Sequence, residues 1–555
     1  MAKPATTGGD NLGRAGALLA SGTIVSRLLG FASAILLART LGTVGSGADT
    51  FALANQLPNN IYALIAGGVL TAVLVPHIVR AGSHSDGGAG YINKIVTLGF
   101  LIFLLLAALA TLLAPLLVAL YAQEAGGTQR GFTPDDMALA TALAYWSLPQ
   151  VLFYALYSLL GEVLNARKVF GPFTWAPVAN NVIFIAGLVV FNALFTDRDV
   201  TVAIEWTATM VALLAGGGTA GIAAPALILL VFWRRAGLAY RPDFQWRGVG
   251  LGKTGRAAGW LFGMILLAQI AGVVQANVAT LATSEGQPGL AILRFSWLLF
   301  MVPHSVIAVS LATAYFTRMA THARDGDTDK VVSDVTRSIR QIGAMMIFAS
   351  AGLLVLSLPF ATLFGGTPEN VEAMGLVITA YATGLAAFSV VFIIQRVFYS
   401  LDDTRTPFVF QLVHTAVFIP LALSTSTFVS DQLAAGLAVS TSLASFAQLA
   451  VALVLLRRAL PTLKLGPILL RLGGFTLATI PAVLFGVIML VAAGGLEPDG
   501  FARASVVGAA SVIAGVGIVM TAMYVGLLLV TKNEDIHTIV GGTRRLIQRV
   551  FSGRE

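Results

Sequence analysis

The chain has 555 residues, of which 57% are hydrophobic and 11% are charged, and its mean hydropathy is +0.85. Soluble domains carry about 25% charged residues, so this composition excludes a soluble globular protein and predicts an all-α polytopic membrane protein. The formal charge of +8 then indicates basic residues at the cytoplasmic membrane surface rather than nucleic-acid binding. The absence of cysteine excludes disulfides, thiolate metal sites and cysteine nucleophiles.

The sequence contains apolar segments long enough to cross a bilayer, for which a helix needs about 20 residues. In chain order, these 14 segments cover residues 15–42, 51–79, 91–121, 137–165, 170–195, 203–233, 254–284, 287–316, 338–364, 371–400, 406–428, 431–456, 466–494 and 503–531. No small-residue cleavage site follows the first segment, so we expect it to remain as a membrane anchor. The connections between segments are short, which argues against a sizeable soluble domain.

The basic residues support this number of spans. If the N-terminus lies in the cytoplasm, 28 of the 34 lysines and arginines fall on the cytoplasmic side or at cytoplasmic helix ends. Of the others, Arg27 and Arg294 lie within spans, and four lie in outward loops: Arg39, Arg130, Arg198 and Arg503. This asymmetry follows the positive-inside rule for an even number of spans and predicts that both termini are cytoplasmic.

An internal repeat relates two halves of the chain. The second and eighth spans each contain a proline followed by polar residues, Pro58-Asn59-Asn60 and Pro303-His304-Ser305. Residues 159–177 and 394–411 correspond in the same way, each as a helix end, a tight turn and the start of the next helix. The offset is an even number of spans, so we expect two parallel six-helix repeats with the substrate between them.

The repeat predicts how the chain is divided. Residues 1–243 form an N-lobe of helices 1–6, and residues 244–461 form a C-lobe of helices 7–12. Residues 462–532 supply two further helices outside the repeat, and residues 533–555 form a basic cytoplasmic tail. The tail mixes apolar residues with arginines, a pattern typical of a short helix on anionic lipid or of a frayed end.

Arg27 is the most unusual residue, because it interrupts an apolar helix near its middle. An arginine at the centre of a spanning helix costs about 2.5–3.5 kcal/mol. The planar guanidinium fits pyrophosphate oxygens, so we interpret Arg27 as an anion-binding cavity residue, with a structural arginine as the alternative. Asn55, Asn59 and Asn60 around Pro58 predict a kinked helix that lines the same cavity or bonds to neighbouring helices.

Other charged residues are candidates for binding or gating. Arg294 lies toward the outer end of span eight, where it binds substrate or snorkels to the interface. Arg39 and Asp49 flank the first outward turn, and Arg396 precedes the inner turn of the second half. We consider these three as gate residues. The alternative for Arg39 and Asp49 is a charge that simply lies in solvent, and the alternative for Arg396 is a structural role in the inner turn. We find no phosphate-binding loop, metal-ligand cluster or nucleophile motif, which favours a protein that is not an enzyme and uses no cofactor or metal.

Together these residues resemble the MurJ (MviN) lipid II flippases of the multidrug/oligosaccharidyl-lipid/polysaccharide exporter superfamily, in an actinobacterial form. The resemblance covers the whole chain, including two C-terminal helices that distinguish this family from twelve-helix relatives. The stretches that carry it are SRLLGF (26–31), AR (38–39), AD (48–49), LPNNIYALIAGGVLTAVLVP (57–76), LLGEVLNARKVFGPFTWAP (159–177) and FYSLDDTRTP (398–407).

The resemblance implies alternating access by two lobes, which carry undecaprenyl-pyrophosphate-linked disaccharide-pentapeptide from the inner to the outer leaflet. It implies that the cavity holds the headgroup and that residues 462–532 form a groove for the lipid tail. The resemblance matches Arg27 to a family arginine implicated in substrate handling and Asp49 to a family acidic position. The chain departs from proteobacterial members where these carry further arginines, at Ser33, Tyr62 and Leu298.

The resemblance also implies a location in the bacterial plasma membrane. The implied partners are lipid II, membrane lipids and candidate proteins of wall synthesis or division, with no nucleic acid. The alternatives are a flippase for another undecaprenyl-linked saccharide, a drug or cation antiporter of the same superfamily, and a non-transporting scaffold of cell-wall synthesis. An antiporter predicts carboxylates within the membrane, of which this sequence has few. A scaffold predicts that Arg27→Ala is tolerated.

Overall fold

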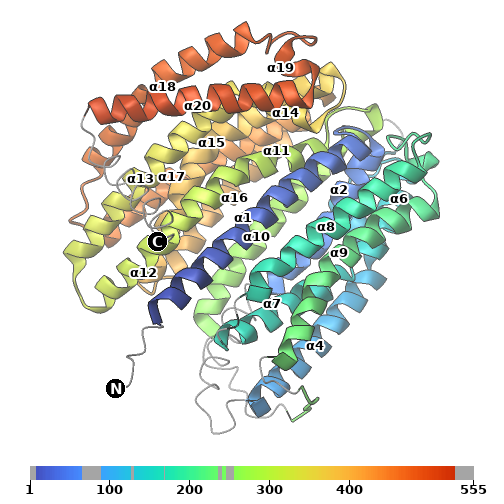
Figure 1. Ribbon diagram of the computed structural model, residues 1–555, viewed down its shortest axis with the longest axis horizontal. Coiled ribbons are helices and arrows are strands. Elements are labelled where there is room, and N and C mark those ends of the chain that lie inside the picture. Colours follow the sequence, from blue (N-terminus) through green and yellow to red (C-terminus); the bar gives the residue numbers. More distant parts are fainter. Residues whose placement is uncertain are drawn as a thin grey trace, which may run out of the picture. The chain divides into compact units, whose positions relative to one another are not determined.

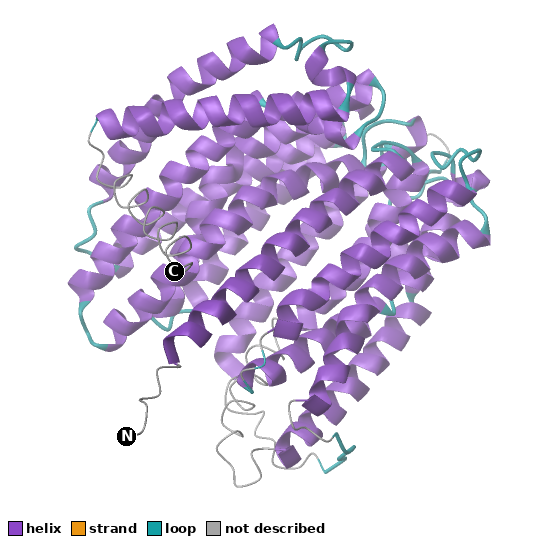
Figure 2. Cartoon of the chain, viewed as in Figure 1, coloured by secondary structure: helices purple, strands orange, loops and turns teal. Residues whose placement is uncertain are grey.

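The computed structural model describes residues 8–65, 89–126, 130–167, 169, 171–235, 240–245 and 255–531, and the predicted tail at 533–555 lies outside them. These described residues are almost entirely helical, with short loops and no strand (Figure 2). A single isolated bridge joins Glu124 and Phe132 among them. The all-α fold expected from the composition is confirmed. The chain divides into two compact units, Met1–Ala291 and Ile292–Glu555.

The helices of the first unit run from blue to green in Figure 1. They are α1 (Gly8–Leu41), α2 (Ser46–Ile65), α4 (Ala89–Leu112), α5 (Ala114–Tyr121), α6 (Pro134–Ser147), α7 (Gln150–Ala166), α8 (Gly171–Leu194), α9 (Ala208–Arg235) and α10 (Gly255–Thr280), with the 3-10 turns η2 (Ala203–Glu205) and η3 (Thr283–Glu285).

Apolar packing joins these helices. A buried core that includes Phe103, Leu159, Val163 and Leu229 connects α4, α7 and α9. α1 packs along α8, and α8 packs along α9. α2 contacts α6, α7 and α10, so the polar helix singled out from the sequence packs against several helices of its own unit.

The second unit begins within α11 (Leu290–Pro303), which carries the chain over from the first. It continues with the π-helical turn η4 (His304–Ala308), α12 (Val309–Arg324), α13 (Thr328–Val355), α14 (Ser357–Phe364), α15 (Pro368–Ser400), α16 (Arg405–Thr425), the turn η5 (Ser430–Gln432), α17 (Leu433–Ala459), α18 (Leu465–Ala492), α19 (Phe501–Ala504) and α20 (Val506–Val530).

Two features hold the last helices of this unit in place. A core that includes Phe475, Met520 and Tyr524 joins α13, α18 and α20, and the Tyr524 hydroxyl donates to the carbonyl of Ala344 at 3.0 Å. The loop after α18 is tied down by Arg503, whose side chain is 3% exposed. Its guanidinium donates to the Glu372 carboxylate and to two backbone carbonyls, those of Leu496 and Pro368.

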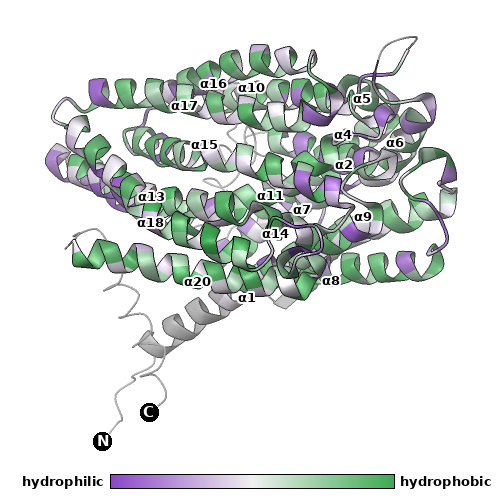
Figure 3. Ribbon diagram, turned by 90° about the horizontal axis from the view of Figure 1, so that it is seen from above, coloured by the Kyte–Doolittle hydropathy of each residue, from purple (hydrophilic) through white to green (hydrophobic). Residues whose placement is uncertain are grey.

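The described residues contain 13 helical segments long and apolar enough to cross a membrane, and these match thirteen of the predicted spans. The remaining predicted span, 51–79, is described over Ser46–Ile65 as α2. Figure 3 shows helices that are mostly hydrophobic along their length, with hydrophilic residues in loops and near helix ends. Length and hydropathy therefore identified the spans, which supports a multi-pass membrane protein.

Several predicted spans are broken rather than continuous. The third breaks between α4 and α5 beside Pro115, and the fourth breaks between α6 and α7 at Pro149. In the eighth, a π-helical turn follows Pro303. Proline removes a backbone donor and disrupts the helical hydrogen-bond ladder, which explains these positions. Pro58, in contrast, lies inside the unbroken α2.

The two short turns predicted as repeat partners have the same length. α7 ends at Ala166 and α8 starts at Gly171, while α15 ends at Ser400 and α16 starts at Arg405.

The compact units divide after Ala291, later than the predicted lobe boundary at 243–244, and α10 packs within the first unit against α2 and α5.

Candidate functional site

Arg27 lies in the interior of α1, 19 residues after its start and 14 before its end. α8 anchors this helix through two amides. Asn181 donates to the carbonyl of Ser26 at 2.8 Å, and Asn192 donates to the hydroxyl of Thr40 at 2.9 Å. The Arg27 side chain is nevertheless exposed at the surface of the unit. α1 is therefore fixed through its neighbours, while the guanidinium is left accessible.

α2 carries a polar face at about the same depth as Arg27. Asn55 and Asn59 are exposed and lie one helical turn apart, so they share one side of the helix. The connection between α1 and α2 is short, spanning residues 42–45. At 1.5 Å per residue, Arg27 and Asn59 each lie about 20 Å from this connection. The cation and the amide therefore occupy the same level of two adjoining, oppositely directed helices.

Asn60 makes contacts between helices instead. Its side chain donates to the hydroxyl of Tyr121 on α5 at 3.2 Å, and its carbonyl accepts from Gln269 on α10 at 3.4 Å. Asn277 of α10 also donates to the carbonyl of Leu120 at 2.7 Å. Of the three asparagines singled out from the sequence, Asn55 and Asn59 present exposed amides, whereas Asn60 links α2 to its neighbours.

Asp49 lies in the first turn of α2 and is completely buried. Its carboxylate accepts from the Thr283 hydroxyl at 2.6 Å and from the Ala291 backbone N–H at 2.7 Å. Gly289 lies so close that a β-carbon there would collide with the carboxylate. Asp49 thus ties the start of α2 to the segment between α10 and α11, which excludes the alternative of a solvated charge.

Arg39, the other gate residue predicted at this turn, is not buried as Asp49 is. Its side chain is exposed in the last turn of α1. The nearby loop before α9 is fixed to α2 by the Ser46 N–H, which donates to the carbonyl of Thr201 at 2.9 Å. Hydrogen bonds from Thr201 also hold the pKa of the Asp199 carboxyl below its usual value, so this loop keeps a negative charge.

In the second unit, Arg294 and Arg396 stand at opposite ends of an aromatic row. Arg294 is exposed in the first turns of α11. Arg396 of α15 is half-buried, with its guanidinium 4.7 Å from the ring centre of Phe392. The rings between them make successive contacts within 6 Å: Trp297, Phe388, His304 and Phe392. This row gives Arg396 a cation–π environment that no sequence motif indicated.

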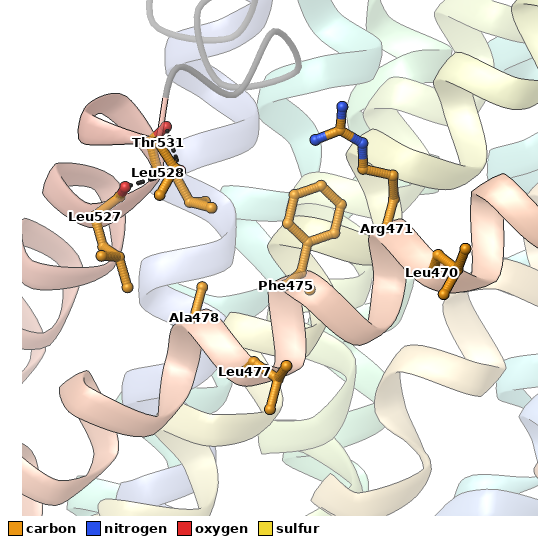
Figure 4. Close-up of a pocket in the computed structure, with 9 residues that line it drawn as sticks. Leu470, Arg471, Phe475, Leu477, Ala478, Leu527, Leu528 and Thr531 are labelled. Atoms are coloured by element: carbon orange, nitrogen blue, oxygen red, sulfur yellow. Dashed lines mark hydrogen bonds between the residues drawn. The ribbon is translucent and has the colours of Figure 1, made fainter.

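α18 and α20 enclose a groove of about 460 Å³ in the second unit. Arg471 and Phe475, one turn apart, point to the same side of α18, and the groove is completed by Leu528 of α20 and by Thr531, which directly follows α20 (Figure 4). Arg471 is six residues from the start of α18, or about 9 Å along the helix, which is close to a membrane interface. The groove therefore combines an apolar wall with a cation at one end.

The fold and these side chains define a class of protein. It is a polytopic helical membrane protein that keeps a cation and polar amides at mid-helix depth, where hydrocarbon disfavours them. The described residues contain no group of three or more histidine, aspartate or glutamate side chains that could hold a metal ion.

Comparisons with known proteins assign the family. The family model described as "Lipid II flippase MurJ" matches residues 37–498. A "Probable lipid II flippase MurJ" of Vibrio cholerae serotype O1 is 25% identical over 458 residues, covering 79% of this chain and 81% of the relative. A protein of the same name from Thermotoga maritima is 24% identical, covering 85% of this chain and 93% of the relative. The chain belongs to the lipid II flippase MurJ family.

Solved structures show the same fold. A structure described as "Lipid II flippase MurJ, inward closed conformation" aligns with a TM-score of 0.68 at 18% identity, covering 92% of this chain and 99% of that chain. An inward-facing multidrug resistance MATE family transporter of the MOP superfamily aligns with a TM-score of 0.60 at 14% identity, covering 79% of this chain and 95% of that chain. The family resemblance drawn from the sequence motifs is confirmed, and both solved structures share the fold of this chain.

Proposed function

We propose that the protein is a lipid II flippase, which moves undecaprenyl-pyrophosphate-linked disaccharide-pentapeptide from the inner to the outer leaflet by alternating access. The observation that carries the proposal is the shared level of Arg27 and Asn59 on adjoining helices, in a chain whose relatives are named probable lipid II flippases. Exposed polar side chains at that depth require a polar surrounding, because hydrocarbon makes them costly.

The chemistry of these residues suits the headgroup. Arg27 supplies a planar, permanently charged fork that binds pyrophosphate oxygens in pairs. Asn55 and Asn59 offer amide donors and acceptors that match sugar hydroxyls and peptide groups. Arg294 supplies a second accessible cation, in the second unit. Arg27, Asn55 and Asn59 form the proposed headgroup site of the first unit, and Asn60 supports it by holding α2 against α5 and α10. Arg294 is a separate proposed substrate-binding residue of the second unit.

The groove between α18 and α20 is the proposed site of the polyprenyl tail. Its walls are formed largely by leucine, alanine and phenylalanine side chains, and Arg471 stands at one end. A prenyl chain buries apolar area against such walls at about 25 cal/mol per Å². An interfacial arginine attracts the phosphate attached to the chain, so the groove matches both parts of a phosphate-linked lipid.

Alternating access requires contacts that break and reform. We assign the outward contact to Asp49 with Thr283 and Ala291, and we place Arg39 beside it as an accessory charge. Arg396, at the end of α15 before the turn to α16, is the proposed counterpart at the inner side. Transport of this kind moves the lipid without making or breaking covalent bonds, so the proposal includes neither an enzymatic step nor a cofactor.

The proposed location is the bacterial plasma membrane with both termini in the cytoplasm, as the distribution of basic residues predicts. A cysteine introduced near either end, tested with a membrane-impermeant thiol reagent, checks this orientation, because the natural chain has no cysteine. Besides lipid II, the proposed partners are membrane lipids and proteins of wall synthesis or division. Co-purification after crosslinking in cells tests the protein partners.

Complementation tests the function directly. The protein is expressed in a bacterium depleted of its own lipid II flippase, and outer-leaflet lipid II is quantified by an external enzyme that acts on exposed headgroups. Growth and restored lipid II exposure are expected. Normal membrane insertion without either result would overturn the proposal. Rescue that persists in Arg27→Ala without lipid II movement would instead indicate a scaffold, and accumulation of a different lipid-linked saccharide would redirect the substrate assignment.

A further inference from the structure

A second groove opens in the first unit, between α6, η2 and the start of α9. Its volume is about 540 Å³, and α6 and α9 pack against each other beside it (Figure 1). The residues that determine its chemistry are Asp135, Tyr145, Trp146, Ile204, Trp206 and Thr207. The groove belongs to different helices from those that carry Arg27 and Asn59, so it is separate from the proposed headgroup site.

The groove has a charged mouth and an apolar floor. Asp135 is exposed in the first turn of α6, whereas Tyr145 and Trp146 lie near the end of that helix. Ten residues of helix place these rings about 15 Å deeper than the carboxylate. Tyr145 and Trp146 are 45% and 48% exposed, and Ile204 is 73% exposed. An amphiphile with a headgroup and a chain fits this gradient better than a small soluble ion does.

The aromatic walls are held in fixed positions. The Trp206 indole N–H donates to the carbonyl of Val200 at 3.0 Å, so this ring offers its face rather than a hydrogen bond. The backbone carbonyl of Trp146 accepts from the Thr219 hydroxyl at 2.7 Å. Gly216 makes room for the Trp146 ring, since a β-carbon there would lie 3.1 Å from it. The groove is therefore preformed.

The charges around the mouth favour a cation. Among the described residues that line the groove, Asp135 is the acidic one and none is a lysine or arginine. The adjoining loop keeps the charge of Asp199, and its Arg198 is engaged with Glu205 at 3.3 Å. The Thr207 hydroxyl oxygen accepts from the Met210 N–H at 3.3 Å, which leaves its own hydrogen available to donate.

We propose that this groove binds one amine-headgroup phospholipid, of the phosphatidylethanolamine class, from the leaflet that meets the start of α6. The ammonium lies between the Asp135 carboxylate and the face of Trp206, where charge and ring quadrupole both attract it. Thr207 donates to the phosphate, and an acyl chain follows Ile204 down to Tyr145 and Trp146. The distribution of basic residues predicts that this leaflet is the outer one.

Quenching of tryptophan fluorescence by brominated acyl chains tests the proposal on the full chain in vesicles. In one titration, vesicles contain an increasing fraction of brominated phosphatidylethanolamine in unbrominated phosphatidylglycerol. In the reference titration, the phosphatidylglycerol carries the bromine and the phosphatidylethanolamine does not. The amine lipid is expected to quench at roughly two- to fivefold lower mole fraction, the preference that a cation–π contact provides. Trp146→Phe should remove most of this difference, because that ring lies at the groove floor.

Three variants separate the contribution of the Asp135 carboxylate from that of the groove itself. Asp135→Asn should abolish the preference for the amine lipid, and Ala142→Phe, which fills the groove, should remove the extra quenching altogether. Asp431→Asn, an exposed acid of the second unit, should change nothing. Equal quenching by both lipids in the natural chain, or an unchanged preference in Asp135→Asn, would overturn the proposal. Displacement of the quenching by tetraphenylphosphonium, without any lipid preference, would assign the groove to soluble lipophilic cations and equally overturn it.

Discussion

The carboxylate of Asp49 accepts a hydrogen bond of 2.6 Å from the hydroxyl of Thr283, a residue 234 positions further along the chain. The same carboxylate also accepts the backbone N–H of Ala291. A completely buried acid needs such partners, because an unsatisfied buried polar group costs about 1–3 kcal/mol. This contact fixes the beginning of α2 to the segment that leads into the second unit.

Thr283→Val should weaken this contact while keeping the shape of the side chain. It removes one hydrogen bond to a buried carboxyl group, and a typical bond of this kind is worth about 0.5–1.5 kcal/mol, so thermal unfolding in detergent should begin at a lower temperature. Thr283→Ser retains the hydroxyl and should behave like the natural chain. Equal midpoints for all three proteins would show that the bond does not contribute to stability.

Gly289→Ala tests the closeness of the backbone to Asp49. The new methyl group would collide with the carboxylate, and overpacking of this kind costs about 1–3 kcal/mol. We expect a lower yield of folded protein and a lower unfolding midpoint. Gly272→Ala, in α10 with no neighbouring atom within 4 Å, is the matched control. The prediction fails if both alanines are equally well tolerated.

Arg27 should be sensitive to shape as well as charge. Arg27→Lys keeps the positive charge but loses the planar fork that binds two oxygens together, so lipid II exposure in the complementation assay should fall. Arg27→Ala should fall further, by about tenfold or more if one charge-assisted contact of about 1.5–3 kcal/mol is lost. Arg458→Ala, an exposed arginine at the end of α17, should retain full activity. Full activity in Arg27→Ala would remove Arg27 from the proposed site.

Substitution of Arg503 should destabilise the protein more than substitution of its ion-pair partner Glu372. Arg503→Leu leaves the carbonyls of Pro368 and Leu496 without this donor, at a cost of about 1–3 kcal/mol. Glu372→Gln should cost less than about 1 kcal/mol, because that side chain is 57% exposed and solvent screens the pair. Unfolding midpoints of the two variants provide the comparison. A larger loss in Glu372→Gln would contradict the assignment of Arg503 as a carbonyl donor.

The sequence located most of the fold, because membrane helices carry a local signal. A run of apolar residues long enough to cross the bilayer is visible without any knowledge of its neighbours, and all thirteen segments found by length and hydropathy coincide with predicted spans. The breaks at Pro149 and after Pro303 also have local causes. Arg27 stood out for the same reason, since its cost in hydrocarbon depends on its own helix.

The hydrogen-bond partners of the polar residues could not be predicted from the local sequence. Thr283 and Ala291 belong to a segment without a motif, and nothing near Asp49 in sequence indicates that they complete its hydrogen bonds. The division of the asparagines, with Asn60 bonded to α5 and α10 and Asn59 exposed, likewise depends on which helices adjoin α2. Both outcomes require contacts between residues far apart in the chain.

The sequence by itself determined that this is a many-spanning helical membrane protein, where its membrane spans lie, and that Arg27 is an anomalous charge within one of them. Hydropathy and helical rise are properties of a single segment, so no tertiary information was needed for them. The tertiary structure decided that Asp49 is a buried acceptor, that Asn60 bonds to α5 and α10, and that α6 and α9 leave a groove. These relationships depend on how helices pack, and packing is set by pairs of surfaces rather than by either surface alone.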